Sequence, residues 1–216
     1  MKILLIGGTG FVGSELLNES LSRQHSVTAL VRDPTKLHEQ ESRHPNLRLV
    51  MGDLLDTRQL PELAEEHELM LVAYSVKTDP TTLRARFAEA VDSIVEAARA
   101  SGTRVIFVGG AGSLFLPDGS QLVDSPDFPA DWKPLAEASR DALQRFENSE
   151  GVNWTLVSPA PNLIPGTRTG QFRLGENDVL FDGDQPASIS TADLAVAILD
   201  EAEKPQFKNR RFTAGY

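Results

Sequence analysis

The sequence predicts a single α/β domain in which helices cover both faces of a mostly parallel, doubly wound sheet of six or seven strands. Short, nearly continuous apolar runs alternate with amphipathic segments along all 216 residues. This alternation is typical of the strand–helix–strand units of a parallel sheet. No repeat or linker divides residues 1–216, and a domain of this length can bury roughly 70% of its unfolded surface.

Each predicted strand is a short apolar run, as expected for strands that are buried on both faces. The predicted strands are 2–6, 26–31, 47–51, 69–73, 103–108, 154–157 and 210–214. Between them, apolar residues recur at helical spacing. The predicted helices are 11–23, 57–67, 83–101 and 190–202, and a further helix is predicted within 132–148. Gly102 ends the third helix, and Ser190 with Asp193 forms a capping-box pattern at the start of the last one.

Two segments, 111–133 and 158–185, interrupt this alternation and are rich in Pro, Gly and Asp. Long irregular loops in a compact domain are usually functional. We therefore expect these two segments to form the walls of a substrate site.

Composition limits the function. The chain has 21 basic and 31 acidic residues, a net charge of −10, which argues against a nucleic-acid partner and against adhesion to anionic membranes. No apolar run approaches the ~18 residues of a membrane span, and the apolar start is too short for a signal peptide, so we expect a soluble cytoplasmic protein. The absence of cysteine excludes disulfides and thiolate chemistry, and the four scattered histidines predict no metal site.

A glycine-rich turn joins the first strand to the first helix with the spacing Gly-x-x-Gly-x-x-Gly, at Gly7, Gly10 and Gly13. In a Rossmann-type domain the first glycine permits the tight turn, the second lets a pyrophosphate approach the backbone, and the third lets the helix pack closely. The free N–H groups and the dipole of the helix N-terminus favour the anion. The residues predicted to bind it are Gly7, Thr9, Gly10, Phe11 and Val12.

The residue that contacts the adenosine ribose is expected about 20 positions later, at the end of the second strand. There, Asp33 would bind the 2′-hydroxyl of NAD, whereas Arg32 would bind the 2′-phosphate of NADP. Asp33 precedes Pro34 and could instead cap a helix. Arg32 could also be a solvated surface charge, and Lys36 could add a second positive charge. This pattern favours NADP, with NAD as the alternative.

Other strand ends should reach the same edge of the sheet, where ligands bind in such folds. Asp53 and Leu54 follow the third strand and could lie beside the adenine, although Asp53 and Asp56 could equally cap the next helix. The nicotinamide side is predicted to be formed by residues that follow the fourth and fifth strands. These are Ala73, Tyr74, Ser75 and Gly110.

These motifs resemble the atypical short-chain dehydrogenase/reductases of the NAD(P)H-binding, NmrA-like kind. The resemblance rests on the glycine turn, on Val31-Arg32-Asp33 and on Gly52-Asp53-Leu54, in that order and spacing. Segments 109–114, 154–170 and 211–216 are most similar to proteins described as NADH-flavin reductases, and the resemblance covers the whole chain. Biliverdin-IXβ-type reductases are more distantly similar.

One departure from the wider superfamily narrows the expected reaction. Most short-chain dehydrogenases use a Tyr-x-x-x-Lys pair as proton donor, but here Tyr74 is followed by Lys77, one residue too near, and the other tyrosine is Tyr216. The helix expected to carry the pair has no tyrosine. The usual ketone–alcohol chemistry thus lacks its acid. Acceptors that delocalise the incoming charge, such as flavins, quinones or bilins, remain possible.

Ser113 follows the glycines after the fifth strand and is the predicted catalytic residue. Its hydroxyl could donate a hydrogen bond to the acceptor as negative charge develops there. Alternatively, it could bond only to nearby backbone in a turn. The sequence therefore predicts an NAD(P)H-dependent reductase of a flavin, quinone or bilin-like acceptor. The alternative is a cofactor-binding redox sensor that catalyses little, and no oligomeric state is predicted.

Overall fold

The computed structural model describes residues 1–56, 58–76 and 79–216 of the chain. Its centre is an eight-stranded sheet in the order β3-β2-β1-β4-β5-β6-β12-β8. All neighbours from β3 to β12 are parallel, and β8 is antiparallel to β12 at the edge. The strands of this sheet are β1 (Lys2–Ile6), β2 (Ser26–Val31), β3 (Leu47–Met51), β4 (Leu69–Val72), β5 (Arg104–Val108), β6 (Trp154–Pro159), β8 (Arg173–Gly175) and β12 (Arg210–Gly215).

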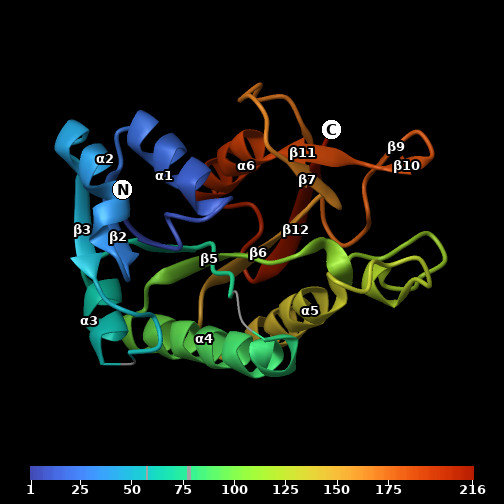
Figure 1. Cartoon of the computed structure of the whole chain (residues 1–216), viewed down its shortest axis with the longest axis horizontal. Helices are drawn as coiled ribbons and strands as arrows, with labels where there is room; N and C mark the ends of the chain where they lie inside the picture. Colours follow the sequence, from blue (N-terminus) through green and yellow to red (C-terminus); the bar gives the residue numbers. More distant parts are fainter. Residues whose placement is uncertain (57, 77–78) are drawn as a thin grey trace.

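Helices cover both faces of the sheet (Figure 1). One face carries α1 and α6, and the other carries α3, α4 and α5. The α-helices are α1 (Gly13–Ser22), α2 (His38–Arg43), α3 (Gln59–Glu65), α4 (Pro80–Ser101), α5 (Lys133–Glu147) and α6 (Thr191–Glu203). Short 3₁₀ helices are η1 (Pro34–Leu37), η2 (Ala111–Ser113) and η3 (Leu122–Asp124).

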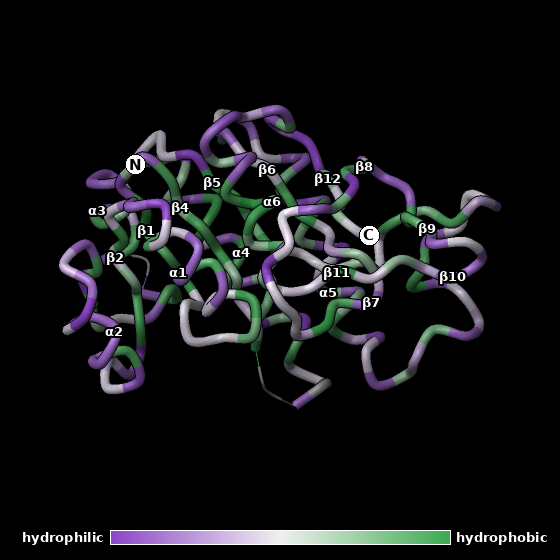
Figure 2. The backbone as a smooth tube through the Cα atoms, turned by 90° about the horizontal axis from the view of Figure 1, so that it is seen from above, coloured by the Kyte–Doolittle hydropathy of each residue, from purple (hydrophilic) through white to green (hydrophobic). Residues whose placement is uncertain are grey.

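Each face of the sheet has its own apolar core. Leu17 of α1 and Ile198 of α6 pack on one face, and Phe87 of α4 and Phe146 of α5 pack on the other. In Figure 2 the sheet strands are largely hydrophobic, and the hydrophilic positions lie mostly on the surrounding segments. The burial of every strand residue from Leu69 to Val72 explains why continuous apolar runs predicted the central strands.

The order of the strands places a ligand site. From β1 the chain proceeds outward through β2 and β3, then crosses back to β4 on the other side of β1. Ile6, the last residue of β1, pairs with Leu30 of β2 and Val72 of β4. In such sheets, ligands bind outside the carboxyl ends of the strands where the order reverses. Here that position lies between the turn after Ile6 and the segment after Val72.

The predicted fold class is confirmed, with the seven predicted strands forming the parallel part of the sheet. The expectation that 158–185 is irregular throughout is wrong, because it contains β7 (Asn162–Ile164), β8 and β9 (Phe181–Asp182). β7 pairs with β11 (Ser188–Ser190), and β9 pairs with β10 (Gln185–Pro186). Segments of two or three residues are too short to show a period of two. Segment 111–133 contains η2, η3 and turns, as expected for a loop.

The helices also differ in places from the prediction. α1 begins at Gly13 and not at residue 11, and 34–43 forms η1 and α2, for which the sequence indicated only a possible capped start at Asp33 and Pro34. Residue 57, the predicted start of the second predicted helix (57–67), lies outside the described residues. None of the helices that the structure describes is long and apolar enough to cross a membrane.

Candidate cofactor-binding and active site

The three glycines of the turn are required for three different reasons. Gly7 has φ +87°, and a Cβ there would lie 2.3 Å from the carbonyl oxygen of Ala73. A Cβ on Gly13 would lie 1.9 Å from the Gly7 carbonyl oxygen, so helix α1 packs directly on the turn. A Cβ on Gly10 would approach the Gly7 carbonyl oxygen alone, at 3.2 Å. The protein's own packing therefore demands Gly7 and Gly13, whereas the space beside Gly10 is open to a ligand.

The N-terminus of α1 provides donors beside this open space. Val12 is the N-cap residue, and no side chain caps the helix there. Gly10 N–H donates to Gly7 and Ser14 N–H to Gly10, but no described residue accepts from the N–H groups of Phe11 or Val12. Unsatisfied N–H groups at a helix N-terminus, together with the helix dipole, favour an anion such as a pyrophosphate.

The structure brings the segment after β4 against the glycine turn. Ala73 N–H donates to the Ile6 carbonyl at 2.9 Å, and its carbonyl faces Gly7. Tyr74 is half-buried and packs on Phe87 of α4, with ring centroids 5.7 Å apart. Ser75 is exposed. Lys77, which follows Tyr74 by three positions and not by the four of a Tyr-x-x-x-Lys pair, lies outside the described residues.

Arg32 and Asp33 have separate roles in the structure. The Asp33 carboxylate accepts from the Thr35 N–H at 3.1 Å and from the Thr35 hydroxyl at 2.6 Å, and Pro34 opens η1. These hydrogen bonds lower the pKa of Asp33. The capping role considered for Asp33 is thus confirmed. Arg32 is exposed and forms no ion pair with a described residue.

The charges of Asp53 and Arg32 both act on the Tyr74 hydroxyl. Burial raises the pKa of Tyr74, the Asp53 carboxylate raises it further, and the Arg32 guanidinium opposes this. Asp53 Oδ1 accepts from the Leu55 N–H at 3.0 Å, which is the capping alternative for this residue. Leu54 is buried, and its carbonyl accepts from Ser93 of α4. An open cavity of about 590 Å³ borders Asp53 and is lined by Met51, Gly52, Asp53, Asp56, Arg58, Gln59 and Glu62.

The turn after β5 packs closely on helix α5. A Cβ on Gly112 would lie 2.8 Å from the Ala136 Cβ of α5, and one on Gly110 would lie 3.3 Å from Ser139. Ser113 is 2% exposed, and its Oγ accepts from Arg211 Nη1 at 2.8 Å. The alternative, in which the Ser113 hydroxyl bonds only to nearby backbone, is therefore wrong. The sequence did not indicate a role for Arg211, because Arg210 and Arg211 together form an ordinary charged start of the last predicted strand.

The segment 165–171, expected to form a wall of the substrate site, is fixed to the domain. Asp193 of α6 is fully buried and accepts from the N–H groups of Thr169 and Gly170 at 2.8 and 2.7 Å. It also accepts from the hydroxyls of Thr169 and Tyr216 at 2.6 and 2.8 Å. The hydroxyl half of the predicted capping box is confirmed, since Ser190 Oγ accepts from the Asp193 N–H at 3.0 Å. The carboxylate binds the loop instead of returning to the N-cap.

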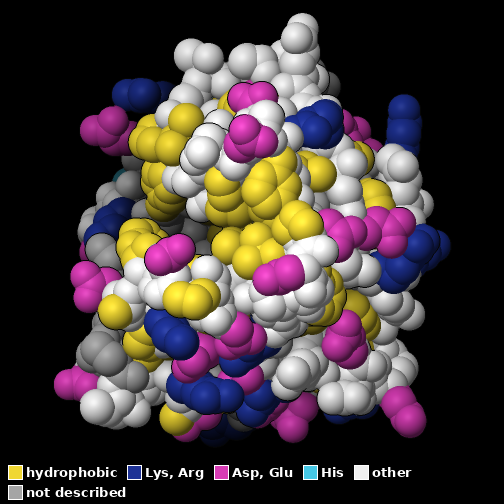
Figure 3. Space-filling view, turned by 90° about the vertical axis from the view of Figure 1, so that its right-hand side faces the viewer, with side chains coloured by type: hydrophobic (Ala, Val, Ile, Leu, Met, Phe, Trp, Pro, Cys, Tyr) yellow, Lys and Arg dark blue, Asp and Glu magenta, His cyan; other side chains and the backbone are white. Residues whose placement is uncertain are grey.

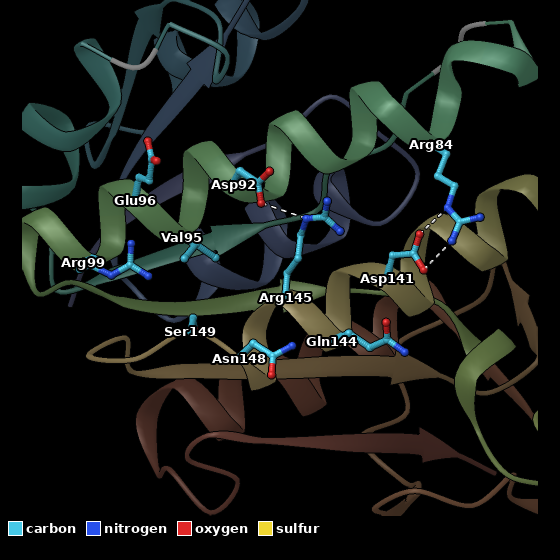
Figure 4. A pocket seen from close by; sticks show the side chains of 10 residues that line it. All are labelled: Arg84, Asp92, Val95, Glu96, Arg99, Asp141, Gln144, Arg145, Asn148 and Ser149. Atoms are coloured by element: carbon cyan, nitrogen blue, oxygen red, sulfur yellow. Dashed lines mark hydrogen bonds and ion pairs between the residues drawn. The ribbon is translucent and has the colours of Figure 1, made fainter.

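A second open cavity, of about 540 Å³, lies between α4 and α5 (Figure 4). Arg84 faces Asp141 across it, with Nη2 and Oδ1 3.0 Å apart, and Arg145 Nε lies 2.9 Å from Asp92 Oδ1. Arg84 and Arg145 are thus already paired with carboxylates, and no predicted site residue lines this cavity. This cavity does not belong to the candidate site.

Comparison with known proteins identifies the family. A family model described as NAD(P)H-binding matches residues 7–205. The chain belongs to this NAD(P)H-binding family. The similarity to atypical short-chain dehydrogenase/reductases that the sequence predicted is confirmed.

Three proteins illustrate what this chain is similar to. The uncharacterized protein YwnB of Bacillus subtilis is 34% identical over 216 residues, which is 99% of this chain and 97% of YwnB. The structure of SP1627 from Streptococcus pneumoniae, named as a candidate NADH-flavin reductase, superposes with a TM-score of 0.85. It is 30% identical, and the match covers 100% of this chain and 99% of SP1627. An NAD(P)H azoreductase of Xenophilus azovorans is 27% identical over 97% of this chain, which spans 66% of that longer protein.

Proposed function

We propose that this chain is an NAD(P)H-dependent reductase, favouring NADPH, that transfers a hydride to a flavin or a similar conjugated acceptor. The observation that carries the proposal is the open space at Gly10 beside the N–H groups of Phe11 and Val12, which have no acceptor in the part of the chain that the structure describes. A side chain at residue 10 would fill the space that a ligand needs. The protein's own packing does not require a glycine at this position. The position at the strand-order reversal and the membership in an NAD(P)H-binding family support the same ligand.

The chain's own residues would bind and orient the reactants. When bound, the dinucleotide would supply the hydride. The N–H groups of Phe11 and Val12 would hold its pyrophosphate, and Arg32 would bind the 2′-phosphate. Ala73 and Gly110 would flank the nicotinamide side, and Ser113 would orient the acceptor.

The acceptor class follows from the missing acid. α5 carries no tyrosine, so no phenol on this helix can protonate a simple alkoxide. A conjugated acceptor avoids this requirement, because it spreads the incoming negative charge and can take its proton from water. Figure 3 shows hydrophobic side chains gathered on the side of the molecule that carries β9, β10 and segment 111–133. Exposed apolar residues of these parts and their neighbours include Phe115, Trp132 and Leu174. Such a face suits a flat aromatic molecule better than a small polar ketone.

The preference for NADPH gives a direct test. Arg32→Ala should weaken NADPH binding about ten- to a hundredfold and leave NADH binding almost unchanged, because a charge-assisted contact to a phosphate contributes roughly 1.5–3 kcal/mol. Fluorescence titration with both nucleotides measures the effect. Arg43→Ala, an exposed arginine of α2, is the control. Equal losses for both nucleotides would show that Arg32 does not read the 2′-phosphate.

Turnover tests the reductase itself. Oxidation of NADPH is followed at its absorbance maximum with FMN, FAD, menadione or biliverdin as acceptor. We expect acceptor-dependent consumption that saturates with acceptor concentration. Tight NADPH binding without consumption for any acceptor would contradict the proposal and favour the non-catalytic redox sensor. That alternative is motivated by the lack of a tyrosine acid and by the burial of the Ser113 side chain.

A further inference from the structure

Arg211 is a buried arginine that holds the turn after β5. It projects from β12 and is 5% exposed. Its Nη1 donates to the carbonyl oxygen of Ser113 at 2.9 Å and to Ser113 Oγ at 2.8 Å. Nε and Nη2 donate to Asn177 Oδ1 at 3.2 and 2.9 Å, and Nη2 also approaches the Asn177 carbonyl at 3.3 Å. The guanidinium therefore joins two loops that are far apart in the sequence.

Among the described residues, the Arg211 guanidinium has no carboxylate partner. No described Asp or Glu lies within ion-pair distance of Arg211, whereas the side chain of Arg104 of β5, which is 10% exposed, forms an ion pair with Glu201. Burial lowers the pKa of Arg211, and the charges of Glu147 and Asp178 oppose this. A buried charge without a counter-ion is costly. Such a feature is expected where the charge has a use besides stability.

The interior beside Arg211 is polar. Thr213 lies two residues further along β12, on the same face of the sheet, and pairs in register with Ser158 of β6. Both residues are fully buried, and neither Thr213 Oγ1 nor Ser158 Oγ has a hydrogen-bond partner among the described residues. Arg211 and Ser113 thus lie beside unpaired hydroxyls, and apolar packing alone does not account for this region.

The contact with Arg211 determines what the Ser113 hydroxyl can do. A hydroxyl has one hydrogen and two lone pairs. Because a guanidinium N–H occupies a lone pair of Oγ, the oxygen is polarised and its own O–H becomes a stronger donor. No described residue accepts a hydrogen bond from this O–H. The hydrogen therefore has no protein acceptor among the described residues, but because the side chain is only 2% exposed, it can be donated only to an acceptor atom that lies directly against the turn after β5.

We propose that Arg211 is a positioning residue of the reductase, which fixes Ser113 and polarises its hydroxyl so that it donates to the acceptor atom gaining negative charge. That atom would be a carbonyl oxygen or a ring nitrogen of the conjugated acceptor. The proton that completes the reduction comes from water. The inference rests on the proposed function. It adds that the Ser113 hydroxyl, polarised by Arg211, donates the hydrogen bond that a Tyr/Lys pair would otherwise supply.

The test is a double-mutant cycle with Ser113→Ala, Arg211→Gln and the double variant, using NADPH and menadione. Each single variant should lower kcat about tenfold with NADPH affinity nearly unchanged, because one charge-assisted hydrogen bond contributes roughly 1.5 kcal/mol or more. In the Ser113→Ala background, Arg211→Gln should have little further effect on kcat. Arg211→Lys, which can still donate to Oγ, should recover part of the kcat lost in Arg211→Gln.

Controls separate this role from a structural one. Arg104→Gln removes a largely buried arginine outside the proposed site and should lower the melting temperature while keeping kcat. If Arg211→Gln does not fold, Asn177→Ala, which frees the guanidinium on its other side, takes its place in the cycle. Losses in kcat that multiply in the double variant, or a lysine variant no better than glutamine, would overturn the positioning role while leaving the reductase intact. Absence of turnover by the wild-type protein would overturn the proposed function as well.

Discussion

Gly10→Val should abolish NADPH binding while the protein still folds. Valine would fill the space beside the N–H groups of Phe11 and Val12 that is proposed for the pyrophosphate. The loss of two charge-assisted hydrogen bonds, at roughly 1.5–3 kcal/mol each, corresponds to a loss of affinity of about a hundredfold or more. Fluorescence titration with NADPH measures the affinity, and circular dichroism with thermal melting measures the fold.

Two further glycine variants make this result specific. Gly8→Ala places a Cβ 3.0 Å from the flexible end of Leu5, so it tests the general effect of a side chain in the turn and should keep most of the affinity. Gly13→Ala would push a Cβ to 1.9 Å from a backbone carbonyl and should destabilise the whole protein. Gly10→Val binding NADPH as tightly as the wild type would refute the dinucleotide interpretation of this turn.

The sequence predicted those features that depend on local patterns. The parallel strands were predictable because each is buried on both faces, so its residues form a continuous apolar run. The glycine turn was predictable because its spacing follows from backbone geometry. The roles of Arg32 and Asp33 could not be separated from the sequence, because the choice depends on whether the Asp33 carboxylate binds Thr35 or a ligand. The structure shows that it binds Thr35.

The features that the sequence did not indicate depend on partners far along the chain. Ser113 was predicted at the right turn, but its partner Arg211 is 98 residues away, and no local pattern links the two. Strand β8 forms because three of its residues pair with the edge of β12. A segment this short has no sequence pattern that would predict such pairing. Asp193 fits a capping box in sequence, yet its carboxylate binds Thr169, Gly170 and Tyr216, because these donors converge on it in three dimensions.

Asp193→Ala should give the largest loss of stability among the variants of the proposed substrate wall. The substitution leaves the buried donors of Thr169, Gly170 and Tyr216 without their acceptor. Removal of one member of a buried charged network typically costs about 3–5 kcal/mol. Urea unfolding followed by tryptophan fluorescence measures the loss, and limited proteolysis should show cleavage within 165–171. Tyr216→Phe removes one donor only and should cost about 1 kcal/mol.

The effect of Asp193→Ala should depend on pH in a defined direction. Burial acts to raise the pKa of Asp193, but the hydrogen bonds from Thr169, Gly170 and Tyr216 outweigh it, so the pKa lies below its ordinary value of 3.8. A carboxyl group whose pKa is lower in the folded state stabilises the protein fully above its unfolded pKa, and this contribution is lost as pH falls through the folded value. The difference in unfolding free energy between wild type and Asp193→Ala should therefore be constant from about pH 7 to 5 and shrink below about pH 4.

Asp184→Ala, which removes an exposed carboxylate in the turn after β9, should change stability by less than about 0.5 kcal/mol at every pH. A difference for Asp193→Ala that grew on acidification would mean that the carboxyl group is held protonated, and the loop would then not be fixed by an ionised acceptor.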